Sequence, residues 1–236
     1  MSTVAMITAR GLFGRRRALM LLPLPLLLIG LAALCKSFDV DPLNWGAPVV
    51  EGLGFAVVLP VIALIVGTGV LGSEIDDGTL VHILTKPLPR RDIILAKYLV
   101  AAVVTTITTT IPLYVVGLLA GSAQFAAALA ISAVVGSFAY TALFVMLSLL
   151  TRRPVLLGLV YILIWEGLLG RWVSGTRVLS IEQYVITLAD KIHPTTMLTG
   201  QLSVTTAVVM SALFVVVSTV VAINRLGSFS LAGETS

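Results

Sequence analysis

Long apolar runs dominate the chain, and they recur at 18–35, 49–71, 99–120, 125–150, 155–170 and 202–223. Each run is apolar on all sides and lacks the polar face of a soluble surface helix. In lipid only a helix or a closed barrel satisfies its own backbone, and a helix needs about 20 apolar residues to cross. Barrel strands would alternate in polarity, which 155–170 and 202–223 do not. The pattern predicts an all-α integral membrane domain, residues 1–236, with six transmembrane helices.

The composition supports this interpretation, because 58% of the residues are hydrophobic and only 11% are charged. Soluble domains have a charged fraction of about a quarter. The net charge of +4 does not indicate nucleic acid, since the basic residues flank apolar runs and are explained by membrane orientation. The single cysteine, Cys35, excludes an internal disulfide.

Lysine and arginine predict the orientation of the six helices. With the N-terminus inside, eleven basic residues lie in inner segments and four in outer ones. The inner set is Arg10, Arg15, Arg16, Arg17, Lys86, Arg90, Arg91, Lys97, Arg152, Arg153 and Arg225, and the outer set is Lys36, Arg171, Arg177 and Lys191. Positive charge favours the inner side, so we expect both termini to be cytoplasmic.

The N-terminal segment, residues 1–17, mixes apolar residues with a basic end at Arg15, Arg16 and Arg17. The apolar run that follows resembles a leader ending at Cys35. Leu34, which precedes the cysteine, is not the small residue that such a leader requires. We therefore expect residues 1–17 to form an interfacial helix on the inner membrane surface.

Charged residues gather between the second and third runs, in the segment 73–92. Ser73 and Asp76 have capping-box spacing, so a helix is expected to begin at Ser73, with its acidic residues in the first turn. Leu80, Ile83 and Leu84 then share one face of a short amphipathic helix. The alternative is an ordinary positive-inside loop.

The run SEIDDGTLVHILTKPLPRRDIILAKYL resembles the signature stretch of ABC-2 type transporter permeases. In that family an acidic residue ends the second span, and a Gly-Thr-Leu, a proline, a basic pair and a lysine follow in order. The matching landmarks here are Glu74, Gly78, Thr79, Leu80, Leu84, Pro87, Arg90, Arg91 and Lys97. Family members often carry Glu or Arg where this chain has Ile75, Asp76 and Asp77, so the charge of a matching partner surface would differ.

The resemblance implies a permease subunit, most similar to those of exporters, in the plasma (inner) membrane of a bacterium. Its loop 73–92 would be a coupling helix seated in a separate ABC ATPase subunit. Two ATPase copies would bind ATP and Mg, and a second permease copy or a related permease would complete the assembly. No cofactor in this chain and no nucleic-acid partner are expected. The implied coupling residues are Glu74, Asp77, Gly78, Thr79, Leu80, Ile83, Leu84, Lys86, Pro87, Arg90 and Arg91.

The resemblance also places residues 171–201 outside, between the fifth and sixth spans, in a segment that often folds back into the outer leaflet. Its apolar residues are compatible with this placement, namely Tyr184, Val185, Ile186, Leu188 and Ile192.

The chain shows no signature of an enzyme. It has no Gly-x-x-x-x-Gly-Lys-Ser/Thr phosphate loop, so ATP would have to bind to another chain. His82 and His193 are the two histidines, and they fall on opposite sides of the predicted membrane. This separation excludes a histidine-based metal site or triad.

Glu166 stands deep in the fifth run, where a carboxylate is costly unless it is paired, solvated or protonated. It could line a translocation path and contact cargo, or lie near the outer interface and pair with Arg171 or Arg177. Thr105 and Thr109, in the run TTITTT, could line the same path, or bond to their own helix and serve packing.

Two other functions stay open. A secondary transporter would work without an ATPase, although no internal repeat relates residues 1–118 to 119–236. A membrane assembly or scaffold protein would need no cytoplasmic coupling helix.

Overall fold

The computed structural model describes residues 21–76 and 90–229, which are almost entirely helical and contain no strand. This confirms the predicted all-α class for the described part of the chain. The elements are α3 (Pro23–Ser37), α4 (Pro42–Ala47), η1 (Pro48–Val58), α5 (Leu59–Asp76), α7 (Arg90–Ala120), α8 (Ala123–Leu150), α9 (Pro154–Val160), η2 (Tyr161–Leu169), α10 (Gly170–Trp172), η3 (Ser174–Leu179), α11 (Ile181–Ile192) and α12 (Val204–Phe229).

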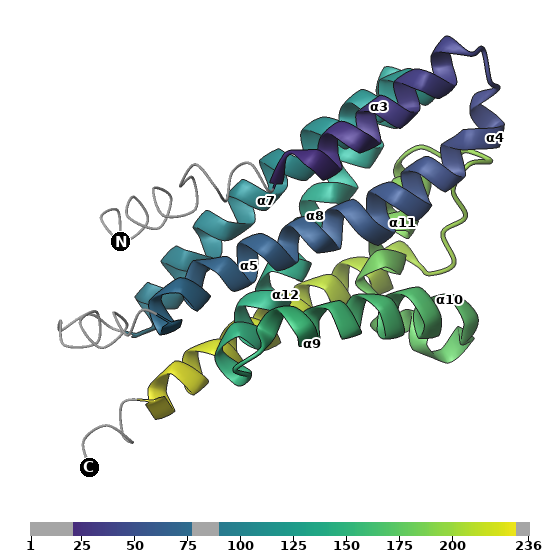
Figure 1. Ribbon diagram of the computed structural model, residues 1–236. Coiled ribbons are helices and arrows are strands. Elements are labelled where there is room, and N and C mark those ends of the chain that lie inside the picture. Colours follow the sequence, from purple (N-terminus) through teal and green to yellow (C-terminus); the bar gives the residue numbers. More distant parts are fainter. Residues whose placement is uncertain (1–20, 77–89, 230–236) are drawn as a thin grey trace.

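The long helices run roughly side by side in one elongated bundle (Figure 1). The elements α4, η1 and α5 follow one another without a break, as do α9, η2 and α10. Both η1 and η2 are π-helical, whereas η3 is a 3₁₀-helix. We call the end of the bundle where α5 ends and α7 begins the Arg90 end. The opposite end, where α7 ends and α8 begins, is the Ala120 end.

Local sequence explains where several helices begin. Proline occupies the first position of α3, α4 and α9, where its missing N–H costs no helical hydrogen bond. Asp41 caps α4 by accepting from Leu43 N at 2.9 Å. Ser122 caps α8 by accepting from Phe125 N at 3.2 Å. Each side chain satisfies a backbone donor that the first helical turn would otherwise leave unpaired.

Four described helices are long and apolar enough to cross a membrane: 42–70, 91–120, 123–150 and 204–226. Two apolar helices are shorter, Pro23–Ser37 and Pro154–Leu169. The outer face of α7 carries exposed apolar side chains at helical spacing, namely Leu99, Val103, Ile107, Ile111 and Leu118. Such a face suits contact with lipid rather than with water.

Helix α8 lies at the centre of the bundle and packs against α5, α7, α11 and α12. Small residues bring its neighbours close. A Cβ added to Gly117 of α7 would lie 2.5 Å from Ala126 Cα, and one added to Gly67 of α5 would lie 3.0 Å from Phe144 Cβ. Close approach of this kind is how membrane helices gain packing energy without a hydrophobic driving force between them.

Helix α11 lies antiparallel to the first half of α8. The ring of His193, just after α11, lies 6.1 Å from the ring of Phe125 near the start of α8. Deeper in the bundle, a Cβ on Gly136 would come 2.6 Å from Val185 Cγ2. Phe125 and Gly136 are separated by about 16 Å of helix. The N-terminus of α11 therefore points into the middle of the bundle, about halfway along α8.

The structure corrects the predicted boundary at Ser73. Residues 73–76 continue α5 to Asp76, so the prediction of a helix start at Ser73 is wrong, and its acidic residues up to Asp76 end a helix instead of beginning one. The capping-box spacing misled the prediction because the preceding apolar helix extends through it. Arg90 and Arg91 belong to α7, nine residues before the predicted start at 99.

Other boundaries also move. The second apolar run extends back to Pro42 through α4 and η1. The fifth run, expected as one regular span over 155–170, is instead divided into α9, π-helical η2 and α10. The predicted interfacial helix at 1–17 and the coupling segment from 77 to 89 lie outside the described residues.

Candidate functional site

The predicted coupling residues that the structure describes lie at the Arg90 end. Glu74 is in the last turn of α5, and Arg90 and Arg91 open α7. Arg91 is exposed, and its Nε lies 3.9 Å from the Asp92 carboxylate, an arrangement that contributes little in water. The remaining predicted residues lie outside the described part of the chain, namely Asp77, Gly78, Thr79, Leu80, Ile83, Leu84, Lys86 and Pro87.

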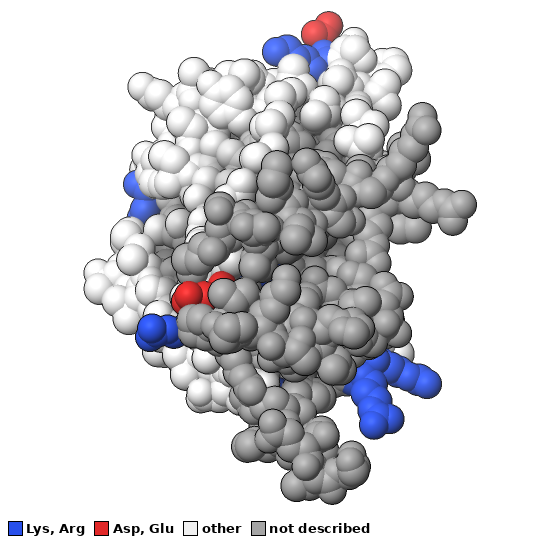
Figure 2. Space-filling model, turned by 90° about the vertical axis from the view of Figure 1, so that its left-hand side faces the viewer, with Lys and Arg blue, Asp and Glu red and all other residues white. Residues whose placement is uncertain are grey.

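Figure 2 views the bundle from the side on which the Arg90 end lies, and it shows Lys and Arg in separate groups on a largely uncharged surface. One lysine at this end is not on the surface. Lys97 of α7 is 1% exposed, and its Nζ donates to the backbone oxygen of Val70 in α5 at 3.4 Å. This contact ties the start of α7 to the last part of α5.

Thr105 and Thr109, the first two of the predicted path residues, are fully buried where α7 meets α8. Thr109 Oγ1 donates to the backbone oxygen of Thr105 at 2.8 Å and lies 3.0 Å from Ser137 Oγ of α8. Thr141 Oγ1 of α8 donates to Thr105 Oγ1 at 3.3 Å. These contacts are those of helix packing, and a path lined by these threonines would require α7 and α8 to separate.

Glu166, the third predicted path residue, is 1% exposed and lies on η2. Its carboxylate accepts hydrogen bonds from its own segment and from the start of α11. Tyr161 Oη donates to Oε1 at 2.8 Å, Ile181 N donates to the same oxygen at 3.0 Å, and Ser180 Oγ donates to Oε2. The carboxylate thus sits against the first residues of α11.

The π-helical winding of η2 explains the contact between Tyr161 and Glu166. Residues five apart in an α-helix point about 140° away from each other, which would separate the two side chains. A π-helix forms its backbone hydrogen bonds over five residues, so Tyr161 and Glu166 lie closer to one face. The irregular winding therefore places a hydroxyl beside the carboxylate.

The segment between η2 and α11 turns back so that Ser180 meets Glu166. Ser180 Oγ also accepts from Gln183 N at 3.2 Å, and it caps α11 in this way. A Cβ on Gly170 would lie 3.1 Å from Ser180 Oγ, so a side chain at this position would crowd the Ser180 hydroxyl. Arg177, which we considered as a partner of Glu166, donates to Gln201 Oε1; the side chain of Arg171 is not described.

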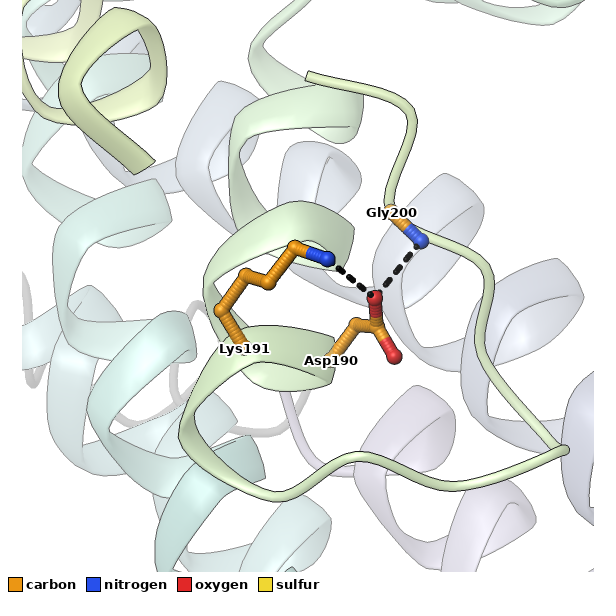
Figure 3. A network of polar contacts seen from close by, with 3 residues as sticks. All are labelled: Asp190, Lys191 and Gly200. Carbon is orange, nitrogen blue, oxygen red and sulfur yellow. Dashed lines mark hydrogen bonds and ion pairs between the residues drawn. The ribbon is translucent and has the colours of Figure 1, made fainter. Parts of the chain in front are cut away.

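The other end of α11 is held by a second polar contact (Figure 3). Asp190 Oδ2 accepts from Gly200 N at 3.2 Å and lies 3.6 Å from Lys191 Nζ. A Cβ on Gly200 would lie 2.7 Å from Thr187 Cα, so only glycine lets the following loop approach α11 this closely. Both ends of α11 are therefore bound to other parts of the chain.

Two acidic residues within the bundle were not predicted from the sequence as candidate site residues. Glu182, assigned to an outer segment, is 1% exposed, and Glu51 lies within η1 in the second apolar run. One signal for α11 was present in the sequence, since Ser180 and Gln183 have capping-box spacing. No group of His, Cys, Asp and Glu among the described residues could hold a metal ion.

Comparison with known families gives one match. Residues 16–173 match the family described as ABC-2 family transporter protein. These residues are about two thirds of the chain and include α3 to α10 as well as the predicted coupling segment. No curated protein matches the sequence.

Proposed function

The chain belongs to the ABC-2 family of transporter proteins, and we propose that it is the membrane-spanning permease subunit of an ABC exporter. A separate ATPase subunit binds ATP and Mg and drives transport. Two ATPase copies and two permease copies, or two related permeases, form the working assembly in the bacterial inner membrane. The family match over residues 16–173 is the observation that carries this proposal.

Six crossings are supported by the helices. Four are long apolar helices, and the two shorter apolar ones, α3 and the rod from α9 to α10, supply the fifth and sixth. An even number of crossings brings both termini to one side. The excess of Lys and Arg at the Arg90 end favours the cytoplasm for that side. The Ala120 end and α11 then face outward.

ATPase docking on the segment between α5 and α7 follows from the family and from the helices that flank it. Helices α5 and α7 pack against each other, and Lys97 bonds to Val70 across them. A push on the intervening segment would therefore move the two helices together. Helix α8 packs against both of them, so the movement would reach the centre of the bundle.

The path of the cargo stays a prediction for Thr105, Thr109 and Glu166. All three are buried within a single chain, so they would meet cargo only after neighbouring helices separate. The hydrogen bonds described for the two threonines favour the packing alternative, because they are made to their own helix and to α8.

Shortening one apolar side chain in the predicted coupling segment tests the docking proposal. Leu84→Ala should leave the permease inserted but reduce the amount of ATPase that co-purifies by about tenfold, because burial of a leucine side chain contributes about 1.5–3 kcal/mol and about 1.4 kcal/mol is a tenfold change in affinity. Two controls match it. Leu99→Ala makes the same truncation on the exposed face of α7, where Leu99 is 48% exposed, and Lys191→Ala removes a charge beside α11.

Both controls should retain the ATPase. If Leu84→Ala also retains the parental amount of ATPase and the parental transport rate, the segment is an ordinary positive-inside loop. If the parent transports with no ATPase bound, a secondary transporter replaces the proposal. If it neither transports nor binds an ATPase, it is an assembly protein.

A further inference from the structure

Glu166 does more than occupy a costly position in the bundle, because the groups that bind it belong to a different element. Tyr161 is on its own segment η2, but Ser180 and Ile181 form the start of α11, fourteen and fifteen residues further along. The N-terminus of a helix carries a partial positive charge and unpaired N–H groups. A carboxylate placed there acts as a cap supplied by another helix.

The groups around Glu166 are placed to donate hydrogen bonds to its carboxyl oxygens. Ile181 N–H can only donate. The Ser180 hydroxyl already accepts from Gln183 N–H at 3.2 Å, so its own hydrogen is directed to Glu166. Both contacts therefore need an acceptor oxygen at Glu166.

The contact lies deep in the bundle, where it limits how α11 can move relative to η2. The first turn of α11 lies about halfway along α8, and the first nine residues of α11, from Ile181 to Ala189, are buried. In other transporters, discontinuous helices near the middle of the membrane direct their N-termini at anionic groups of the substrate, whereas here the anionic group is the chain's own Glu166. Helix α11 covers the outer half of α8, so an outward-opening movement at this face must either carry η2 along or break the Glu166 contact.

We infer that Glu166 is a positioning residue that anchors the buried N-terminus of α11 to η2 and thereby holds the outer side of the permease closed at rest. It acts as the acceptor of an interhelical cap. The outward direction of this face rests on the proposed function, whereas the anchoring of α11 does not.

Cysteine labelling measures the anchor directly. Cys35→Ser removes the native thiol, and Val185→Cys places a reporter on the buried face of α11, against Gly136. The full chain, with its ATPase bound, is reconstituted in vesicles and treated with a membrane-impermeant maleimide. Glu166→Gln should raise the labelling rate about tenfold, because it replaces one of the two acceptor oxygens of the cap with an NH2 group, which can only donate. Glu166→Asp, which keeps two acceptor oxygens, should label more slowly than Glu166→Gln.

A milder pair of variants guards against general loss of folding. Tyr161→Phe removes one donor to Glu166, and it should raise the labelling rate by a smaller factor. Tyr98→Phe is the matched control, since the buried Tyr98 hydroxyl donates to Phe138 O at 3.2 Å between α7 and α8, a bond in which neither α11 nor η2 takes part. It should label at the parental rate.

The inference is overturned if Glu166→Gln and Tyr161→Phe both label at the parental rate. It is also overturned if Tyr98→Phe raises labelling as much as Tyr161→Phe does, because the effect would then be general loosening. The labelling rates of the same variants can also be compared with the parent in vesicles that lack the ATPase. A failure of the proposed transport function would therefore leave the result on α11 intact, and a failure of the anchor would leave the ATPase partnership intact.

Discussion

Two groups of polar side chains lie inside the apolar bundle, and their hydrogen bonds run to different kinds of partner. In the contact between α7 and α8, the hydroxyls of Thr109 and Ser137 bond to backbone oxygens one turn earlier in their own helix as well as to each other. Around Glu166 the bonds run from one element to another. The comparison teaches that burial of a polar residue in a membrane bundle does not by itself indicate function.

A hydroxyl that bonds to its own helix would keep that bond if the neighbouring helix moved away. That bond therefore places no constraint on the arrangement of α7 and α8, which are linked through the contacts of Thr109 with Ser137 and of Thr141 with Thr105. The Glu166 carboxylate keeps its partners only while α11 starts at this one place. The hydroxyls of α7 and α8 satisfy their hydrogen bonds largely within their own helices, whereas the Glu166 contacts fix where α11 begins relative to η2.

The largest effect is expected from removing the carboxylate. Glu166→Ala leaves Ile181 N–H and the Ser180 hydroxyl buried without their acceptor, and each such group costs about 1–3 kcal/mol. We expect the free energy of unfolding in mixed micelles to fall by about 3 kcal/mol, measured by denaturant titration. An unchanged stability would show that water or a relaxed backbone replaces the carboxylate.

The second-largest loss of stability is expected from a substitution that causes steric overlap between two helices. Gly117→Ala places a Cβ 2.5 Å from the Ala126 backbone, and backbone atoms cannot move aside as a flexible side chain can. Overpacking of this kind costs about 1–3 kcal/mol. The same titration measures it, with Gly30→Ala as the matched control, because no atom lies within 4 Å of a Cβ at Gly30. Equal stabilities for the two variants would contradict close packing of α7 on α8.

A smaller effect is expected in the threonine contact. Thr109→Val removes a hydroxyl that bonds to its own helix and to Ser137, and Ser137 keeps its bond to Ala133 O at 2.7 Å. Interhelical hydrogen bonds in membrane proteins contribute about 0.6 kcal/mol on average, so the loss should be of that size. Thr109→Ser should retain the parental value. A loss as large as that of Glu166→Ala would remove the distinction between the two polar groups.

The smallest effect is expected at the other end of α11. Lys191 lies 3.6 Å from Asp190 and its side chain is 49% exposed, and exposed ion pairs contribute little. Lys191→Ala should leave stability within error of the parent. A clear loss of stability would show that the charge of Lys191 is needed to hold the Asp190 contact with Gly200.

The same comparison explains what could be read from the sequence. Helical class and the approximate positions of the apolar helices follow from residue type alone, because each helix satisfies its own backbone in lipid. The local cap of α11 was readable too, in Ser180 and Gln183. The partner of Glu166 was not, since the contact depends on how a segment of about a dozen residues turns back and on the π-helical winding of η2.

The helix boundary at Ser73 failed for a related reason. Ser73 and Asp76 carry a pattern typical of a helix start, but the preceding run of apolar residues, from Leu59 onward, was already helical and continued through them to Asp76. Local signals compete with the helix that precedes them, and the longer element prevails because extending a helix is easier than starting a new one.

The mass of the native complex tests the central claim most directly. The chain should be purified from its own membrane in mild detergent, and the complex weighed by native mass spectrometry together with identification of its subunits. We expect two permease chains, 24.9 kDa each if the complex is a homodimer, with two copies of an ABC ATPase. A single chain that transports cargo with no ATPase bound would contradict it.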